Sequence, residues 1–237
     1  MKYQALKNLG ILALGLAVFS ACSDEEDMEI IATSSDITIT DTNTEGTAEG
    51  DVGNTGADED DLVANATFEN TIQIQFSETS ATIVNPVPED VVITQDGAVV
   101  TINSSISKVA YEVSGATTDG MLKIYSDKKF KLSLSDLSIV NNDGPAINVQ
   151  SSKTVFVLLE GVNTLADASS YSNIPDDEDA KAAFFSEGQL VFSGSGELNV
   201  AGKYKHGIAS DDYIRVISGT ITVSEAASDA MHANDYI

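Results

Sequence analysis

The sequence predicts an all-β protein, a parallel β-helix with coils of about 24 residues that follows a disordered acidic tether. Three observations predict this fold. Apolar and polar residues alternate from residue 66 onward, similar phrases return at intervals of about 24 residues, and no convincing helical stretch interrupts them. Because each interval holds only short strands, each unit can bury its apolar side chains only by stacking on its neighbours.

The first residues predict a lipoprotein signal peptide over residues 1–21. Lys2 and Lys7 precede an apolar run at residues 9–19, which is too short to span a bilayer as a mature helix. The sequence "FSAC" then ends at Cys22 and resembles a bacterial lipobox, with Phe19 where leucine is usual. Cys22 is the single cysteine, so no internal disulfide is possible, and we expect it to be lipidated. An ordinary signal peptide with an incidental cysteine is the alternative.

Residues 22–65 predict a flexible tether. The stretch from residue 24 to residue 61 holds 14 acids and no basic residue, and it has too few large apolar groups to form a core. Its start, "SDEED", resembles the surface-export tag of Bacteroidota lipoproteins, the alternative being a charged start to a linker. We therefore expect a lipid-anchored protein at the outer membrane that faces the cell exterior.

The net charge of -25 excludes two classes of electrostatic partner. Nucleic acids and anionic lipid headgroups would be repelled, so contact with a membrane is expected only through the lipid anchor. The same charge suits multivalent cations and neutral ligands. Nothing in the sequence indicates an oligomeric state.

Residues 66–237 carry the repeat, and its interval predicts which residues stack. Residue pairs 24 positions apart, such as Leu190 and Ile214 or Phe192 and Val216, are expected to point inward in neighbouring coils. Leu198 and Ile221 should form another column, and a further row should contain Ile147, Phe184, Ile208 and Met231. One interval is longer by about 13 residues, which places an excursion at residues 166–181. A β-sandwich would not require a fixed interval, and a leucine-rich horseshoe requires a Leu and Asn pattern that is absent.

The domain resembles the bacterial carbohydrate-binding domain-containing protein family. Residues 144–237 carry the resemblance, with the phrases "NTLADASSY", "AAFFS" and "GIASDD", and residues 91–115 match more loosely. The resemblance implies a right-handed, pectate-lyase-like β-helix that binds calcium and has affinity for plant-type or acidic polysaccharides. Members of the family usually continue further, so we expect residues 66–237 to be a C-terminally incomplete domain.

Acidic residues at corresponding places in successive coils predict a calcium site. Stacked carboxylates repel each other unless they are protonated, solvated or bridged by a cation, and calcium accepts six to eight oxygen ligands. Four consecutive acids on the excursion return beside the same coils. Ordinary turn residues and a solvated loop are the alternatives. The candidate ligands of Ca²⁺ are Asp176, Asp177, Asp179, Glu187, Asp211, Asp212, Asp229 and Asp235.

Flat aromatic faces usually bind sugar rings, and this chain has no tryptophan. The candidates for sugar contact are Tyr171, Tyr204, Tyr213 and Arg215, with Tyr236 as a further tyrosine; outward surface residues are the alternative. His206 and His232 occupy near-equivalent places in successive coils and could ligate a transition metal. No third nitrogen or sulfur ligand is visible, so we interpret both as turn residues.

The leading functional hypothesis is a surface-anchored lipoprotein that binds polysaccharide without catalysis. A calcium-dependent polysaccharide lyase is the second hypothesis, because such chemistry needs a cation and a basic residue, for which Lys203, Lys205 and Arg215 are available. A passive adhesin is the third. The sequence contains no nucleophile elbow, phosphate-binding loop or zinc signature.

Overall fold

The computed structural model describes residues 59–172 and 174–237. The signal peptide, Cys22 and the tether up to residue 58 lie outside the described residues, so the lipoprotein assignment stays a prediction. Two short 3₁₀ helices begin the described chain, η1 (Glu59–Asp61) and η2 (Val63–Asn65), and the rest is built from strands. No helix within the described ranges has the length and apolarity needed to cross a bilayer.

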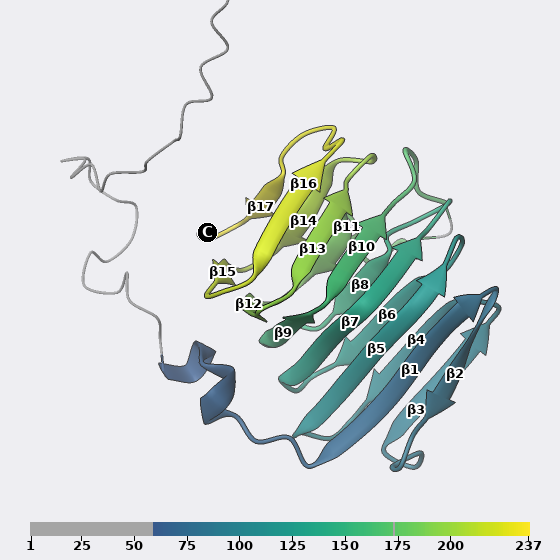
Figure 1. Ribbon diagram of the computed structural model, residues 1–237, viewed down its shortest axis with the longest axis vertical. Coiled ribbons are helices and arrows are strands. Elements are labelled where there is room, and N and C mark those ends of the chain that lie inside the picture. Colours follow the sequence, from purple (N-terminus) through teal and green to yellow (C-terminus); the bar gives the residue numbers. More distant parts are fainter. Residues whose placement is uncertain (1–58, 173) are drawn as a thin grey trace, which may run out of the picture. The chain divides into compact units, whose positions relative to one another are not determined.

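The strands of residues 70–233 form two sheets (Figure 1). The larger sheet contains β1 (Asn70–Glu78), β2 (Ser80–Val84), β5 (Val109–Thr117), β7 (Phe130–Val140), β9 (Val155–Glu160), β10 (Val162–Ala166), β12 (Leu190–Gly194), β13 (Glu197–Ala201), β15 (Ile214–Val216) and β16 (Thr220–Ser224). The smaller sheet contains β3 (Val91–Asp96), β4 (Val99–Ser104), β6 (Met121–Ser126), β8 (Ile147–Gln150), β11 (Ala182–Ser186), β14 (His206–Ser210) and β17 (Met231–Ala233).

Strand pairing is parallel except at the N-terminal end of the described body, where β1–β2 and β3–β4 pair antiparallel. The long strand β7 joins two branches of the larger sheet. Its first half pairs with β9, which leads to β12 and β15, and its last residues pair with β10, which leads to β13 and β16. The structure thus confirms a mostly-β fold with parallel sheets.

The predicted columns of stacked residues are present in the strand register. Leu190 pairs with Ile214 and Leu198 pairs with Ile221. The row Ile147, Phe184, Ile208 and Met231 runs through β8, β11, β14 and β17. Phe192 pairs with Val216 as predicted, although Val216 is 43% exposed because β15 lies at the end of its sheet branch.

The core lies between the sheets and consists of the inward Ile, Leu, Val and Phe side chains of successive strands. A buried asparagine joins three neighbouring turns of the chain. Asn163 Oδ1 accepts a hydrogen bond from the Leu137 amide at 3.0 Å, and Nδ2 donates to the Glu160 and Glu197 carbonyls at 3.0 Å each. Its full burial makes these bonds important, because an unpaired polar group there would be costly.

A bulge bends the larger sheet where β5 pairs with β7. The register shifts after Ser114, and Gly115 has a φ of +87°. A Cβ atom at Gly115 would lie 2.1 Å from the Phe76 carbonyl oxygen, so glycine is required by both backbone conformation and space.

Candidate functional site

Two pairs of stacked tyrosines lie beyond opposite ends of β14. In the first pair, the rings of Tyr171 and Tyr204 have centroids 4.0 Å apart and planes inclined by 23°. Tyr204 precedes β14 and is 42% exposed. Tyr171 is half-buried and lies on the excursion between β10 and β11. The structure therefore brings these two predicted sugar contacts together and leaves one ring accessible.

Asp167 holds the first tyrosine pair in place. Its buried carboxylate accepts a hydrogen bond from the Tyr171 hydroxyl at 2.6 Å and others from the amides of Lys203 and Tyr204, at 2.5 and 3.4 Å. Burial raises the pKa of Asp167 above its usual range, although these hydrogen bonds oppose that effect. Burial and the neighbouring Asp167 also raise the pKa of Tyr171, so its hydroxyl stays protonated.

The second pair consists of Tyr213 and Tyr236, with ring centroids 4.7 Å apart and planes inclined by 6°. The Arg215 guanidinium carbon lies 5.7 and 5.9 Å from the two ring centroids. Tyr236 is 47% exposed, so its ring presents the accessible face of this pair. The predicted contacts Tyr213 and Arg215 therefore form one cluster with Tyr236.

Asp61 fixes this second cluster from a distant part of the chain. Its side chain is 3% exposed. The carboxylate accepts a hydrogen bond from the Tyr213 hydroxyl and forms an ion pair with Arg215 Nη1 at 2.6 Å. Burial and Asp61 raise the pKa of Tyr213. Asp61 falls within the tether predicted from the sequence, whereas in the structure it is buried against Tyr213 and Arg215. Arg215 is consequently engaged in an ion pair and is not a free cation for lyase chemistry.

The acidic excursion is held by lysines. Glu178 forms an ion pair with Lys123 and accepts a hydrogen bond from the Tyr125 hydroxyl, with both charged side chains almost fully buried. Lys181 Nζ lies 3.1 Å from Asp179 Oδ2 and also pairs with Asp211. Burial alone would lower the pKa of Lys181, but the two carboxylates outweigh it and raise that pKa.

The remaining predicted calcium ligands divide into separate groups. Asp176 and Asp177 are exposed on the excursion. Burial raises the pKa of Glu187, and the charges of Asp211, Glu178 and Asp179 add to that shift. Burial likewise raises the pKa of Asp212, with Asp235 as the next cause. The carboxylates therefore repel each other in two places, which is the condition from which we predicted a cation.

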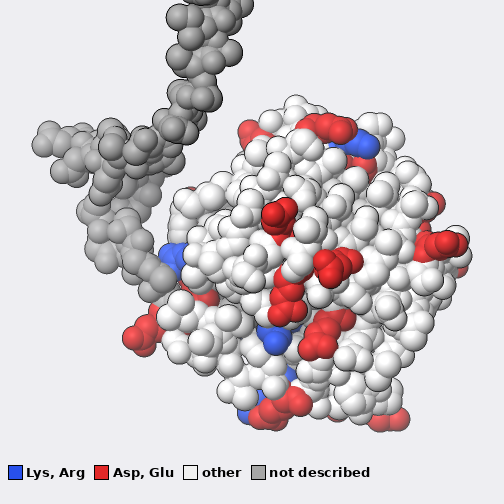
Figure 2. Space-filling model, viewed as in Figure 1, with Lys and Arg blue, Asp and Glu red and all other residues white. Residues whose placement is uncertain are grey.

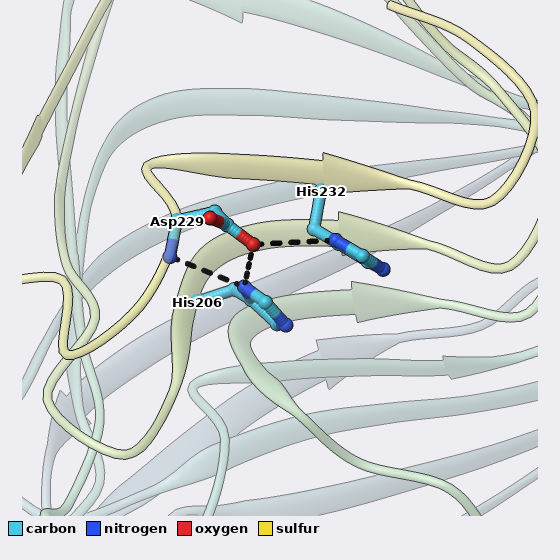
Figure 3. A group of neighbouring side chains, drawn as sticks. All are labelled: His206, Asp229 and His232. Carbon is cyan, nitrogen blue, oxygen red and sulfur yellow. Dashed lines mark hydrogen bonds and ion pairs between the residues drawn. The ribbon is translucent and has the colours of Figure 1, made fainter.

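The carboxylate of Asp229 lies beside two stacked imidazoles and contacts the Nδ1 atom of each (Figure 3). Its Oδ2 is 3.1 Å from His206 Nδ1 and 3.3 Å from His232 Nδ1, and the two rings stack with centroids 4.4 Å apart and an interplanar angle of 14°. The ligating atoms of His206, Asp229 and His232 all lie within 4.8 Å of one another, so this group could hold a metal ion. The interpretation of both histidines as turn residues overlooked this carboxylate.

His206 is the buried member of the group. It begins β14, its side chain is 2% exposed, and its Nε2 has no hydrogen-bond partner. Burial lowers its pKa, and the charges of His232 and Lys205 lower it further, whereas the charge of Asp229 opposes that shift. His232 on β17 is 38% exposed and Asp229 is 52% exposed, which opens the group to solvent on one side.

A polar groove crosses the outward face of β1, β5, β7 and β9 and has a volume of about 450 Å³. Its lining includes Gln73, Gln75, Glu112 and Lys131, with serine hydroxyls between them, and Gln73 Nε2 donates to Glu112 at 3.3 Å. Figure 2 views the molecule from the same side as Figure 1 and shows acidic side chains scattered singly over this face, with few basic ones. This groove could not be predicted from the sequence, because period-2 alternation marks outward residues but does not show where the sheet is concave.

The chain matches a known protein family over most of its described residues. The family model described as "Carbohydrate-binding domain-containing protein" matches residues 89–237. The chain belongs to this family. A curated member from Acetivibrio thermocellus is 30% identical over 118 residues, which are 48% of this chain and 41% of that protein. The chain thus spans about two fifths of the relative that it matches.

A solved structure confirms the fold similarity. The polysaccharide lyase-like protein from C. thermocellum, studied as a gadolinium derivative, superposes with a TM-score of 0.52 over 65% of this chain and 61% of that chain. Sequence identity is 20%, so this likeness shows the fold alone. The resemblance drawn from the sequence is confirmed for the carbohydrate-binding family and for the parallel β architecture.

Proposed function

We propose that this protein binds polysaccharide at a cell surface without catalysis, and that the accessible rings of Tyr204 and Tyr236 contact the sugar. Membership of the carbohydrate-binding family over residues 89–237 is the observation that carries the proposal. Each ring is stacked on a second tyrosine, and a hydrogen-bonded carboxylate holds that partner. Such rigid aromatic faces contact ligands at low entropic cost.

The two tyrosine pairs suit an extended ligand. They lie beyond the two ends of β14, whose five residues span about 17 Å at 3.3 Å per residue. A polymer that contacts both pairs would gain from two attachments held by one scaffold. Of the three basic residues that lyase chemistry could use, Arg215 is paired with Asp61 and Lys203 lies 3.9 Å from Glu225, which leaves Lys205 as the remaining candidate base.

Calcium is part of the proposal through Glu187, Asp212 and Asp235. The raised pKa values of Glu187 and Asp212 reflect carboxylate neighbours whose repulsion a divalent cation would relieve. Acidic glycans would also need such a cation, because the surface is strongly acidic. We also propose the finer architecture, a right-handed β-helix with coils of about 24 residues. Strand pairs such as Leu190 with Ile214, which are 24 positions apart in the sequence, support it.

The anchor rests on sequence alone. Cys22 follows "FSA" at the end of an apolar run, and an acidic segment follows it, which supports lipidation and placement at the outer membrane with the body facing outward. Metabolic labelling with a fatty acid tests this part. A Cys22→Ala chain that keeps the label would contradict it.

A glycan array probed with the full chain, with and without chelator, tests the binding proposal. We expect Tyr204→Ala and Tyr236→Ala each to weaken binding by about 5- to 100-fold, because an aromatic contact contributes about 1–3 kcal/mol. Val162→Ala is the matched control, since Val162 is 55% exposed on β10 and belongs to neither pair.

Two results would decide against this proposal. Unchanged binding in both tyrosine variants, together with loss in Gln73→Ala, would move the sugar contact to the groove. Release of unsaturated products from pectin, seen as new ultraviolet absorbance, would favour the lyase hypothesis. Calcium dependence is shown by loss of glycan binding in chelator and its return on adding calcium.

A further inference from the structure

Three ligand atoms converge between β14 and β17 from residues that the strand register brings side by side. Ile208 pairs with Met231, so His206 on one strand lies opposite Asp229 on the next turn of the chain, and His232 follows Asp229 by three positions. Figure 3 shows both imidazoles projecting in the same direction, with the Asp229 carboxylate against their Nδ1 atoms. Asp229 was one of the predicted calcium ligands, and the structure places it with two histidines instead. The group shares no residue with the tyrosine pairs or with Glu187, Asp212 and Asp235.

Without a cation, His206 Nδ1 faces two neighbours that make opposite demands on it. The Asp229 amide points its N–H at His206 Nδ1 at 3.3 Å, which requires an unprotonated Nδ1. That nitrogen then presents its lone pair 3.1 Å from the Asp229 carboxylate, a repulsive contact. Moving the proton to Nδ1 restores the carboxylate contact but opposes the amide N–H. The buried Nε2 has no partner in either form.

We propose that His206 Nδ1, His232 Nδ1 and Asp229 Oδ2 bind a zinc-type transition-metal ion. Ligands in a tetrahedral zinc site lie about 2.0–2.1 Å from the ion, so neighbouring ligand atoms are about 3.3 Å apart. The two nitrogen–oxygen distances here, 3.1 and 3.3 Å, match that edge, and all three ligand atoms lie within 4.8 Å of one another. The ion takes the His206 lone pair in place of the long amide hydrogen bond and converts the repulsive contact into two metal–ligand bonds.

The donor set selects against calcium. Calcium requires six to eight oxygen ligands, whereas this group offers two imidazole nitrogens and one carboxylate. Two nitrogens and one carboxylate oxygen are a known zinc set with one position left for water, and copper(II) also prefers such ligands. The exposed sides of Asp229 and His232 supply the entry path, and buried His206 fixes the geometry.

Binding measurements with the metal alone test the inference. The full chain is used as Cys22→Ser in every sample, so that the thiol contributes nothing. We expect calorimetry with zinc to give one ion per chain at this group, unaffected by excess calcium. Cobalt(II) is a second probe, because a tetrahedral site intensifies its visible absorption. Zinc should also raise the melting temperature, since it binds the folded chain selectively.

The decisive variants change the exposed ligands, which leaves the core intact. His232→Ala and Asp229→Asn should each weaken zinc binding by at least about tenfold and abolish the cobalt spectrum. Asp96→Asn is the matched control, because Asp96 is an exposed acid on β3. Equal zinc binding in the two ligand variants, competition by calcium, or no zinc bound by the parent chain would each overturn the inference. Glycan binding by metal-free protein is measured separately, so either proposal can fail alone.

Discussion

Replacing Asp61 by asparagine should destabilise the domain, because this residue anchors Tyr213 and Arg215. Both carboxylate oxygens are used, and the Asp61 and Arg215 side chains are 3% and 15% exposed. Hydrogen bonds to charged groups contribute about 1.5–3 kcal/mol, and breaking a fully buried pair costs about 3–5 kcal/mol. Arg215 keeps its contacts with two tyrosine rings and some solvent, so we expect a loss of about 2–3 kcal/mol.

Thermal and denaturant unfolding of the full chain measure this effect. For a body of this size the melting temperature should fall by about 5–10 °C. Glu59→Gln is the control, because it changes an exposed acid two positions away. A double-mutant cycle with Arg215→Gln should show coupling between the two sites. A loss below about 0.5 kcal/mol in Asp61→Asn would refute the reasoning.

Two further changes test the scaffold and its charges. Asn163→Ala should lower the free energy of unfolding by about 3 kcal/mol, because it leaves three backbone groups without their partner, and a loss under 1 kcal/mol in urea unfolding would contradict this. Burial and nearby acids raise the pKa of Glu187, so the native chain loses stability as the pH rises from the ordinary glutamate value of about 4.3 through the raised one. Glu187→Gln should therefore raise the free energy of unfolding at pH 7 by less than about 1 kcal/mol, and the two chains should be equally stable below pH 4. A stability gain in Glu187→Gln that does not change with pH would disprove this.

The parallel fold could be predicted because its signal repeats along the chain. Alternation assigns side chains to the inside or outside, and the 24-residue interval assigns them to neighbours, so Leu190 with Ile214 followed from spacing alone. The long interval between Ile147 and Phe184 likewise placed the excursion where it lies. The exposure of Val216 could not be predicted from spacing, since it depends on where the sheet branch ends.

Charge pairing could not be predicted because it is not periodic. The partners Asp61 and Arg215 are 154 positions apart, and Glu178 and Lys123 belong to different turns of the chain. Spacing predicted that acids stack but not that Lys181 would lie between Asp179 and Asp211. Asp229 and the two histidines were each considered from the sequence, but only the strand register showed that their side chains lie close together.

These pairings indicate where added calcium would act. When acidic residues stack at corresponding positions of successive strands, the repulsion between neighbouring carboxylates must be offset at each position. Lys181 offsets it at Asp211. Asp212 and Asp235 have no basic partner among the ion pairs of the described residues, and burial and mutual repulsion raise the pKa of Asp212. The stabilisation gained from calcium should therefore arise mainly at Asp212 and Asp235, and zinc should act independently of it at His206, Asp229 and His232.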